Sequence, residues 1–275
     1  MIKRILRNKS VLIGGVIVLF FIILAVFAPI ISPYSPTDAD LMRSLEPPQK
    51  NFLFGTDVQG RDILSRIIYR SRISLSVGLI VQGISLTIGI TMGLFSGYYG
   101  GLIDDIISSL MNIMFSFPSL LFAIAIMAVL GPSLYNIFLA LGIINWPTIA
   151  RLVRGETLSL KKRDFIEASK ALGTPSIIII FKHILPNCLA PIIVVSTLGI
   201  ADAILTEATL SFLGLGIQPP TPSWGSMLSR GREYIWSAPH LVIFPGLAIL
   251  ITVLGFNLLG DGLRDVLDPK LKDIQ

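Results

Sequence analysis

Residues 163–186 read RDFIEASKALGTPSIIIIFKHILP, a polar segment with the pattern of two helices and a turn, and strongly apolar runs flank it. The wider stretch 151–186 holds seven Lys and Arg residues. Positive charges are costly inside hydrocarbon and collect in the aqueous loops of membrane proteins. We therefore expect this segment to lie outside the bilayer, where a partner in the cytoplasm can dock on it.

The composition is that of an integral membrane protein. Of the 275 residues, 53% are hydrophobic and 14% are charged, and the mean hydropathy is +0.78. An average soluble domain has about 25% charged residues. Six runs approach or exceed the length that crosses a hydrocarbon core of ~30 Å, which is ~20 residues. These runs are residues 11–31, 73–98, 106–130, 134–150, 189–213 and 241–259.

The six runs predict an all-α membrane protein with six transmembrane helices. Inside lipid every backbone N–H and C=O group must be paired, and the alternating pattern of barrel strands is absent. If residues 1–10 are cytoplasmic, the inside segments hold 14 of the 22 Lys and Arg residues and the outside segments hold 8. The charge bias therefore predicts that both termini are cytoplasmic.

The motifs of common catalytic sites are missing from the sequence. There is no GxxxxGK[ST] phosphate loop, no HExxH and no GxSxG. His183 and His240 are the only histidines, and the predicted topology places them on opposite sides of the membrane. Cys188 is the single cysteine, which rules out an internal disulfide. We expect no catalytic residue, no metal site, no bound cofactor and, because the net charge of +5 comes from the membrane edges, no nucleic-acid partner.

Residues 61–72 predict an interfacial amphipathic helix that leads into the second span. Their apolar side chains recur at helical spacing, and the polar ones take the other face, namely Asp62, Arg66 and Arg70. A solvated helix on the lipid headgroups is the alternative. We accordingly divide the chain into 1–72, with the first span and the outer loop, and a core of 73–275.

Prolines and tryptophans mark three further features. Pro118 lies inside the third run and Pro147 near the end of the fourth, where the missing N–H predicts a kink. Kinks of this kind are common in membrane helices and do not by themselves imply a gate. Trp224 and Trp236, in the last outer segment, are expected at the membrane interface.

Two carboxylates in the fifth run are candidates for a translocation pathway. At ~1.5 Å per residue a helix over 191–213 is ~33 Å long, which places Asp202 near its middle and Glu207 in its outer third. A charge at this depth costs at least ~2.5 kcal/mol, so both should face protein or water. Asp202 shares a polar stripe with Thr206, and Glu207 lies on a second stripe. For each residue a lined pathway and an interhelical hydrogen-bond clamp both remain open.

The polar segment itself predicts two short helices that meet at a fixed corner. Asp164 can cap a helix whose apolar face is Phe165, Ala168 and Leu172. Gly173 fits the position after a helix end, where a positive φ is favoured, and Thr174-Pro175 can begin the next helix. An amphipathic connector lying on the inner leaflet is the alternative.

The segment resembles the EAA loop of ATP-binding-cassette importer permeases, whose pattern is EAA-x3-G-x9-I-x-L-P. The match consists of Glu167-Ala168-Ser169, Gly173 and Leu185-Pro186, with Ser169 in place of the second Ala and His183 in place of Ile. In that family the loop, here about 151–186, forms the coupling helix that fits a cleft in a separate ATPase. The resemblance implies a coupling role for Phe165, Glu167, Ala168, Ser169, Lys170, Leu172, Gly173 and Pro186.

Three other segments resemble the C-type permease subunit of dipeptide, oligopeptide and nickel importers. They are FGTDVQGRDILSRIIYRSRISLSVG (54–78), EATLSFLGLGIQPPTPSWGSML (207–228) and NLLGDGLRDVLDPK (257–270). With the EAA loop they span most of the chain from 54 to 270. Arg70 departs from the family, whose members often have Gly there, which leaves the packing of that segment open.

The resemblance implies a six-helix, type I importer subunit in a bacterial or archaeal plasma membrane. Its partners would be a homologous B-type permease, two cytoplasmic ATPases that bind the ATP, an extracytoplasmic substrate-binding protein and membrane lipids. Peptides are the expected substrate, and nickel or a metal chelate is the alternative within the family. Two rivals from other classes are a membrane scaffold protein and an ion-coupled secondary transporter with Asp202 or Glu207 as a proton site, although we find no internal repeat.

Overall fold

The computed structural model describes residues 8–218 and 223–267, which form helices and connecting loops with one isolated bridge between Thr56 and Asp62. Five helical stretches are long and apolar enough to cross a membrane. They are α2 (Lys9–Val26), α4 (Ile63–Tyr99), α7 (Leu134–Leu160), the stretch Ser176–Phe212 and α12 (His240–Leu267). A bent pair, α5 (Gly101–Ser116) and α6 (Ser119–Leu130), makes a sixth span if it is counted as one. The prediction of an all-α protein with six spans is confirmed on that count.

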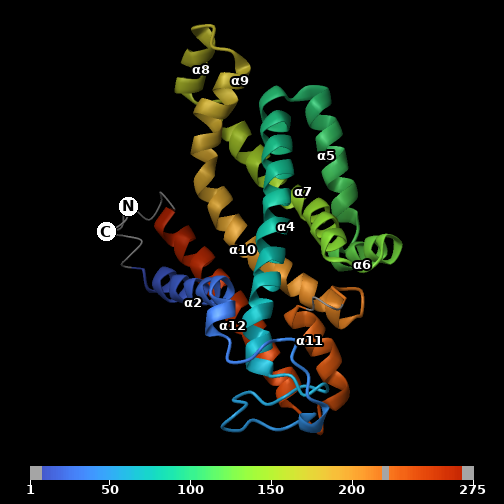
Figure 1. Cartoon of the computed structure of the whole chain (residues 1–275). Coiled ribbons are helices and arrows are strands. Elements are labelled where there is room, and N and C mark those ends of the chain that lie inside the picture. The colour runs from blue at the N-terminus through green and yellow to red at the C-terminus, as the bar shows by residue number, and fades with distance from the viewer. Residues whose placement is uncertain (1–7, 219–222, 268–275) are drawn as a thin grey trace.

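The shorter elements cap the two ends of the long helices. At one end lie α8 (Asp164–Ala171) and α9 (Ser176–Ile178), and Figure 1 shows them projecting beyond the ends of α4 and α7. At the other end lie α3 (Ala28–Ile31), η1 (Leu41–Arg43), α11 (Trp224–Gly231) and η3 (Arg232–Tyr234). The stretch Ser176–Phe212 consists of α9, the π-helical turn η2 (Ile179–Ile184) and α10 (Leu185–Phe212).

Helices α4 and α7 run parallel and pack backbone to backbone along a row of glycines. A Cβ on Gly89 would lie 2.9 Å from the carbonyl oxygen of Trp146, and one on Gly93 would lie 2.6 Å from that of Ala150. One turn further, Gly97 meets Arg154 in the same way, at 2.9 Å. Spacing by four residues places these glycines on one face, where they let two helices approach closely in lipid.

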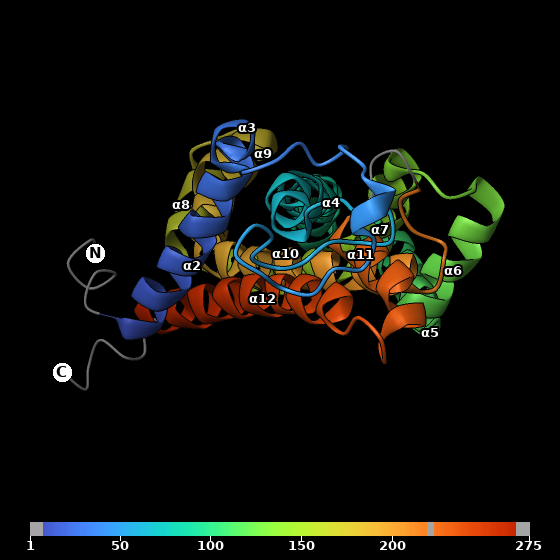
Figure 2. The same cartoon turned by 60° about the horizontal axis from the view of Figure 1, so that its bottom comes forward.

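Helices α2 and α12 are antiparallel and also approach closely at glycines. A Cβ on Gly14 would lie 2.7 Å from the carbonyl oxygen of Gly255, and one on Gly262 would lie 2.6 Å from Cγ2 of Val11. In Figure 2, where α4 is seen nearly end-on, α2 lies against the end of α12. The first span is thereby joined to the last.

The two proline-containing runs fold differently. Pro118 caps α6 and separates it from α5 by a bend of 89°, so the third run forms two helices and not one kinked helix. Pro147 lies inside α7, which continues ten residues past the apolar run to Leu160. Pro147 is buried among the packed helices, whereas Pro118 and its neighbours are exposed, so little packs against that corner.

The segment 61–72 leads into the second span as a helix, as expected, but its polar face is not solvated. Helix α4 runs without a break from Ile63 to Tyr99, and Asp62 is its N-cap, accepting a hydrogen bond from Ser65 N at 2.7 Å. The face that was expected to be solvated is buried, since Arg66 is only 2% and Arg70 only 8% exposed. The outer loop and α11 cover this face.

Trp224 is likewise not an interface residue. Its side chain is fully buried, its Nε1 donates to the carbonyl oxygen of Ile67 at 3.0 Å, and its ring packs edge-on against Phe21. Trp236, by contrast, is 97% exposed, as an interface residue would be.

We predict that Gly93→Ala destabilises the protein by about 1–3 kcal/mol, because the new methyl group must displace the backbone of α7. Gly83→Ala is the matched control, because it lies in the same helix and nothing lies within 4 Å of its added Cβ. The measurement is the midpoint of thermal unfolding of the purified protein in detergent. A fall that is no larger for Gly93→Ala than for Gly83→Ala would contradict the backbone contact.

Candidate functional site

Helix α8 is a short, exposed helix that is held to the molecule by one buried side chain. Ile166 is completely buried and packs in a cluster with Val153 of α7 and with isoleucines of η2. Phe165 is 45% and Leu172 is 86% exposed, so the apolar face predicted for this helix points away from the chain. An exposed apolar face on a helix that Ile166 anchors on its other side is suited to binding a partner protein.

The corner after α8 has the backbone expected from the sequence. Gly173 has φ of +75°, its N–H donates to the carbonyl oxygen of Lys170 at 2.9 Å, and Thr174 N donates to that of Ser169 at 3.1 Å. These bonds close the C-terminal end of α8 with a glycine in the left-handed region. The prediction of a positive φ at Gly173 is confirmed.

The second helix of the corner is not short, in contrast to the expectation. It begins at Ser176 and continues through η2 and α10 to Phe212, as one stretch that includes the fifth span. Ile179, Ile180 and Ile184, which hold Ile166, belong to this stretch. The projecting helix is therefore connected to the membrane span without an intervening hinge loop.

Charged side chains tie the ends of four helices together beneath α8. Asp104 of α5 accepts from Arg154 of α7 at 2.6 Å with each of its two oxygens, and also from the hydroxyl of Ser96 of α4. The centre of the Tyr98 ring lies 5.6 Å from Nζ of Lys170 in α8 and 5.7 Å from Nζ of Lys161, the C-cap of α7. Cations over an aromatic ring are attracted to its face.

Four residues of this region could not be named from local patterns alone: Ile166, Tyr98, Asp104 and Arg154. Ile166 carried a signal, since at ~100° per residue it lies off the face formed by Phe165, Ala168 and Leu172 and needs its own buried partner. The other three residues come from segments distant in sequence, and no local pattern joins them. Of the residues assigned to coupling, Ser169 is partly buried and the others are exposed, including Glu167, Ala168 and Pro186.

Glu207 joins two helices on the other side of the molecule. It is 1% exposed, and its Oε1 accepts from the hydroxyls of Ser211 and Ser223, each at 2.6 Å. Ser211 lies one turn further along α10, and Ser223 is the N-cap of α11. Close contact accompanies this link, since a Cβ on Gly225 would lie 2.5 Å from Cα of Ala208.

Asp202 and Glu207 lie in different surroundings. Asp202 is exposed and lines a cavity of about 80 Å³ together with Gln82 of α4 and Thr148 of α7. Thr206 is partly buried one turn away. A cavity of about 600 Å³ adjoins the first, and Val195 lines both. Together they follow one face of α7 and α10, from the middle of the spans toward the end that bears α8.

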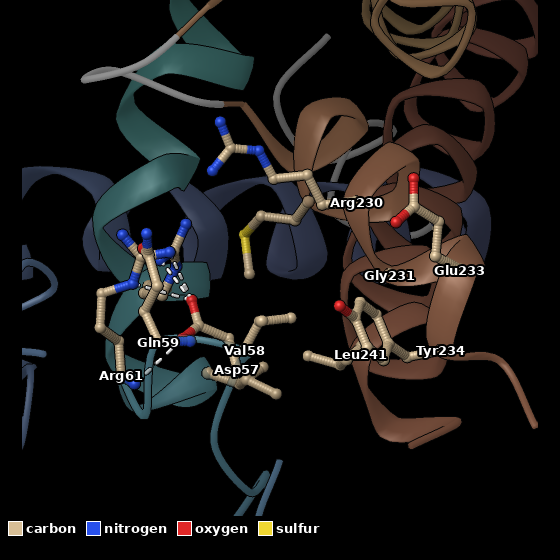
Figure 3. A pocket seen from close by; sticks show the side chains of 12 residues that line it. Asp57, Val58, Gln59, Arg61, Arg230, Gly231, Glu233, Tyr234 and Leu241 are labelled. Carbon is tan, nitrogen blue, oxygen red and sulfur yellow. Dashed lines mark hydrogen bonds and ion pairs between the residues drawn. The ribbon is translucent and has the colours of Figure 1, made fainter. Parts of the chain in front are cut away.

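A third cavity, of about 260 Å³, lies at the outer end between the start of α4 and α11 (Figure 3). Asp57 is its charged centre, and its Oδ2 accepts from Arg66 at 2.6 Å and from Arg61 at 2.6 Å. Its Oδ1 accepts from the backbone N–H of Gln59 at 2.8 Å. Figure 3 shows Arg230 of α11 on the far side of the cavity from Arg61. The carboxylate thus offsets a buried guanidinium and orders the loop.

Within residues 8–218 and 223–267, no three His, Cys, Asp or Glu side chains are grouped so that they could hold a metal ion. The two histidines lie far apart: His183 is in η2 beneath α8, and His240 begins α12 with its Nε2 3.2 Å from the carbonyl oxygen of Thr56. Of the terminal charges that entered the topology argument, Lys9 and Arg264 lie within the described residues, and the other five lie outside them: Lys3, Arg4, Arg7, Lys270 and Lys272.

Comparison with known families gives two matches that together cover most of the chain. Residues 89–273 match the family described as binding-protein-dependent transport system inner membrane component. Residues 1–48 match the N-terminal transmembrane domain of oligopeptide transport permease C. The inward-facing MetNI methionine ABC transporter has a similar fold, with a TM-score of 0.59, 19% identity, and coverage of 74% of this chain and 96% of that one.

Three proteins with similar sequences are named as permeases for dipeptides, for di- and tripeptides, and for glutathione. The dipeptide transport system permease protein DppC of Alkalihalophilus pseudofirmus is 51% identical over 98% of this chain and 89% of its own length. The di/tripeptide permease DppC of Pseudomonas aeruginosa is 46% identical, with coverage of 97% and 90%. The glutathione permease GsiD of Escherichia coli is 44% identical, with coverage of 98% and 89%.

We predict that Asp57→Ala destabilises the outer region by about 3–5 kcal/mol, because it leaves the guanidinium of Arg66 buried without its counter-charge. The control is Asp40→Ala, which breaks an ion pair with Arg43 whose side chains are 50% and 53% exposed. Exposed pairs contribute about 0–1 kcal/mol. Thermal unfolding midpoints of the purified variants measure the difference. Equal midpoints for the two variants would show that Asp57 does not hold the buried charge.

Proposed function

Because the chain belongs to the family of binding-protein-dependent transport system inner membrane components, as a C-type permease of ATP-binding-cassette importers, we propose that it forms half of a peptide pathway and that α8 couples this pathway to ATP hydrolysis. The observation that supports this proposal most directly is the geometry of α8. Its outward face is apolar and exposed, and its inward face is anchored by Ile166.

In this proposal the exposed side chains of α8 enter a cleft in a cytoplasmic ATPase. Phe165 and Leu172 fill apolar positions, while Glu167 and Lys170 set the polar contacts at the edge. Ala168 and Ser169 are small enough to let the partner backbone approach. A movement of the ATPase would displace α8. Because the corner at Gly173 joins α8 to the stretch Ser176–Phe212, that stretch would move with it.

The proposed substrates are short peptides. The three relatives named above transport dipeptides, di- and tripeptides, and glutathione, which is itself a tripeptide. Nickel or a metal chelate remains the alternative in the same family, although none of these relatives is named for it. The family depends on binding proteins, which argues against an ion-coupled secondary transporter.

The proposed partners are a homologous B-type permease, two ATPase subunits that bind the ATP, an extracytoplasmic substrate-binding protein and the lipids of a bacterial inner membrane. For Glu207 we propose the role of an interhelical clamp, since both hydroxyl donors to its carboxylate are protein groups. For Asp202 and Thr206 we propose the pathway, since the Asp202 side chain lines a cavity.

The coupling role predicts a selective defect in Gly173→Val. A β-branched residue at positive φ costs about 1–3 kcal/mol and should distort the corner while leaving the spans inserted. Nothing lies within 4 Å of a Cβ at Gly173, so backbone strain is the main effect. Gly155→Val is the control, since it has equal space and lies within α7.

The measurements are peptide uptake and substrate-stimulated ATP hydrolysis by the complete importer in proteoliposomes. Both should fall together in Gly173→Val, by roughly fivefold or more for a strain of about 1 kcal/mol, and stay near wild type in Gly155→Val. Two ATPases should co-purify with the wild-type permease pair. If Gly173→Val binds the ATPases and still couples ATP hydrolysis to uptake as the wild type does, the proposed coupling role of α8 is contradicted.

The proposed orientation predicts labelling from opposite sides of the membrane for Lys162→Cys and Trp236→Cys. Both parent residues are exposed, and the natural Cys188 is buried, so background labelling should be slow. An impermeant maleimide should reach residue 236 in right-side-out vesicles and residue 162 only in inverted ones. Labelling of both from one side would contradict the six-span topology.

A further inference from the structure

The cavity of about 80 Å³ beside Asp202 is lined by polar groups from three spans. Gln82 comes from α4, Asn145 and Thr148 come from α7, and Asp202 comes from α10. Polar side chains at mid-span are costly in lipid and mark substrate or ion pathways when they surround a common space. These polar groups line one cavity although they come from separate helices, which is the arrangement expected of a binding site.

Gln82 has a hydrogen-bonding group that the protein leaves unused. Its side chain is 3% exposed, and its Nε2 has no partner among the described residues. The other end of the amide lies over Gly199, where a Cβ would come within 2.3 Å of Oε1. Glycine at this position therefore makes room for the amide. A buried donor without a partner carries its full desolvation cost, so a rotation of the amide that brings Nε2 into the cavity would be favoured once an acceptor lies there.

Asp202 supplies a hydrogen-bond acceptor, its carboxylate, where Gln82 supplies a donor. It is exposed to the cavity, and none of the ion pairs formed by the described residues involves it. Helix α10 carries two carboxylates in its membrane-spanning part. Glu207 accepts from two protein hydroxyls, whereas Asp202 lines the cavity. A carboxylate in a span requires a cation or several donors.

We propose that this cavity receives the N-terminal residue of the transported peptide. The ammonium group donates to the carboxylate of Asp202, and the first carbonyl oxygen accepts from Nε2 of Gln82. In a peptide these two ligand atoms are about 3 Å apart, because only Cα and the carbonyl carbon separate them. An unpaired amide and a carboxylate that line one small cavity fit this pair. The assignment rests on the proposed function and adds residues that contact the substrate.

The adjoining cavity of about 600 Å³ gives the rest of a peptide somewhere to extend. Besides Val195, it is lined by Asn187 of α10, Glu156 of α7 and Arg264 of α12. Its position toward the α8 end makes it the continuation of the same face. A peptide held by its amino group beside Asp202 would extend its C-terminal part into this cavity, which is lined by the cation of Arg264 and the carboxylate of Glu156.

Protection of an introduced cysteine tests the site without relying on the binding protein. Thr148→Cys places an accessible thiol in the cavity, because Thr148 is exposed, while the natural Cys188 is fully buried. The variant is assembled into the complete importer with cysteine-free partners. A neutral methanethiosulfonate reagent is used, so that removing the charge of Asp202 does not alter the attraction of the reagent itself.

Dialanine at millimolar concentration should slow the modification of Thr148→Cys, and N-acetyl-dialanine should not. In Thr148→Cys/Asp202→Asn, the dialanine concentration needed for protection should rise at least ~10-fold, as expected for loss of a charge-assisted hydrogen bond. Thr148→Cys/Asp105→Asn is the control, since it removes one exposed carboxylate of α5 away from the cavity.

Three results would overturn the assignment: no protection by dialanine, equal protection by both peptides, or protection that survives Asp202→Asn. Uptake of dialanine by the same importers is measured in parallel. Uptake without selective protection would reject this site while leaving the proposed peptide transport standing. No uptake in the wild-type importer would reject the proposed function itself.

Discussion

The close approach of α4 and α7 is the contact on which the rest of the molecule depends. Gly89, Gly93 and Gly97 let the backbones meet over about two turns, so the two parallel helices form one unit. The ends of this unit bring Tyr98 beneath α8 and Arg154 to Asp104. Larger side chains in the glycine row would separate the helices, and the platform that supports α8 would lose its shape.

The same unit forms one wall of the face that leads through the membrane. Gln82 and Thr148 reach the small cavity because α4 and α7 are held in register, and α10 completes it with Asp202. Helix α10 is continuous with the segment that anchors Ile166. One helical stretch therefore contacts the coupling helix at one end and the proposed peptide site near its middle. This continuous stretch directly connects the proposed docking helix to the proposed peptide site.

Features that are determined locally could be predicted from the sequence. The spans follow from apolar length, and the backbone at Gly173 follows from the run Leu172-Gly173-Thr174-Pro175, which ends one helix and begins another. Features that depend on distant packing could not. The amphipathic pattern of Asp62, Arg66 and Arg70 was correct, but it does not say that α11, more than 150 residues later, covers that face. The four-residue spacing of Gly89, Gly93 and Gly97 is visible in the sequence and indicates a close helix contact, but it does not say which helix is the partner.

The link from Glu207 to Ser223 also bears on how the protein is made. Ser211 lies on the same helix and can reach the carboxylate as soon as α10 forms, but Ser223 is synthesised 16 residues after Glu207. During biogenesis the fifth span therefore enters the bilayer with an acidic group that has only half of its final donors. Completion of α11 supplies the rest. The nascent chain thus gains its stable arrangement at this point only after the outer segment has emerged, which places α11 among the elements that determine the order of membrane assembly.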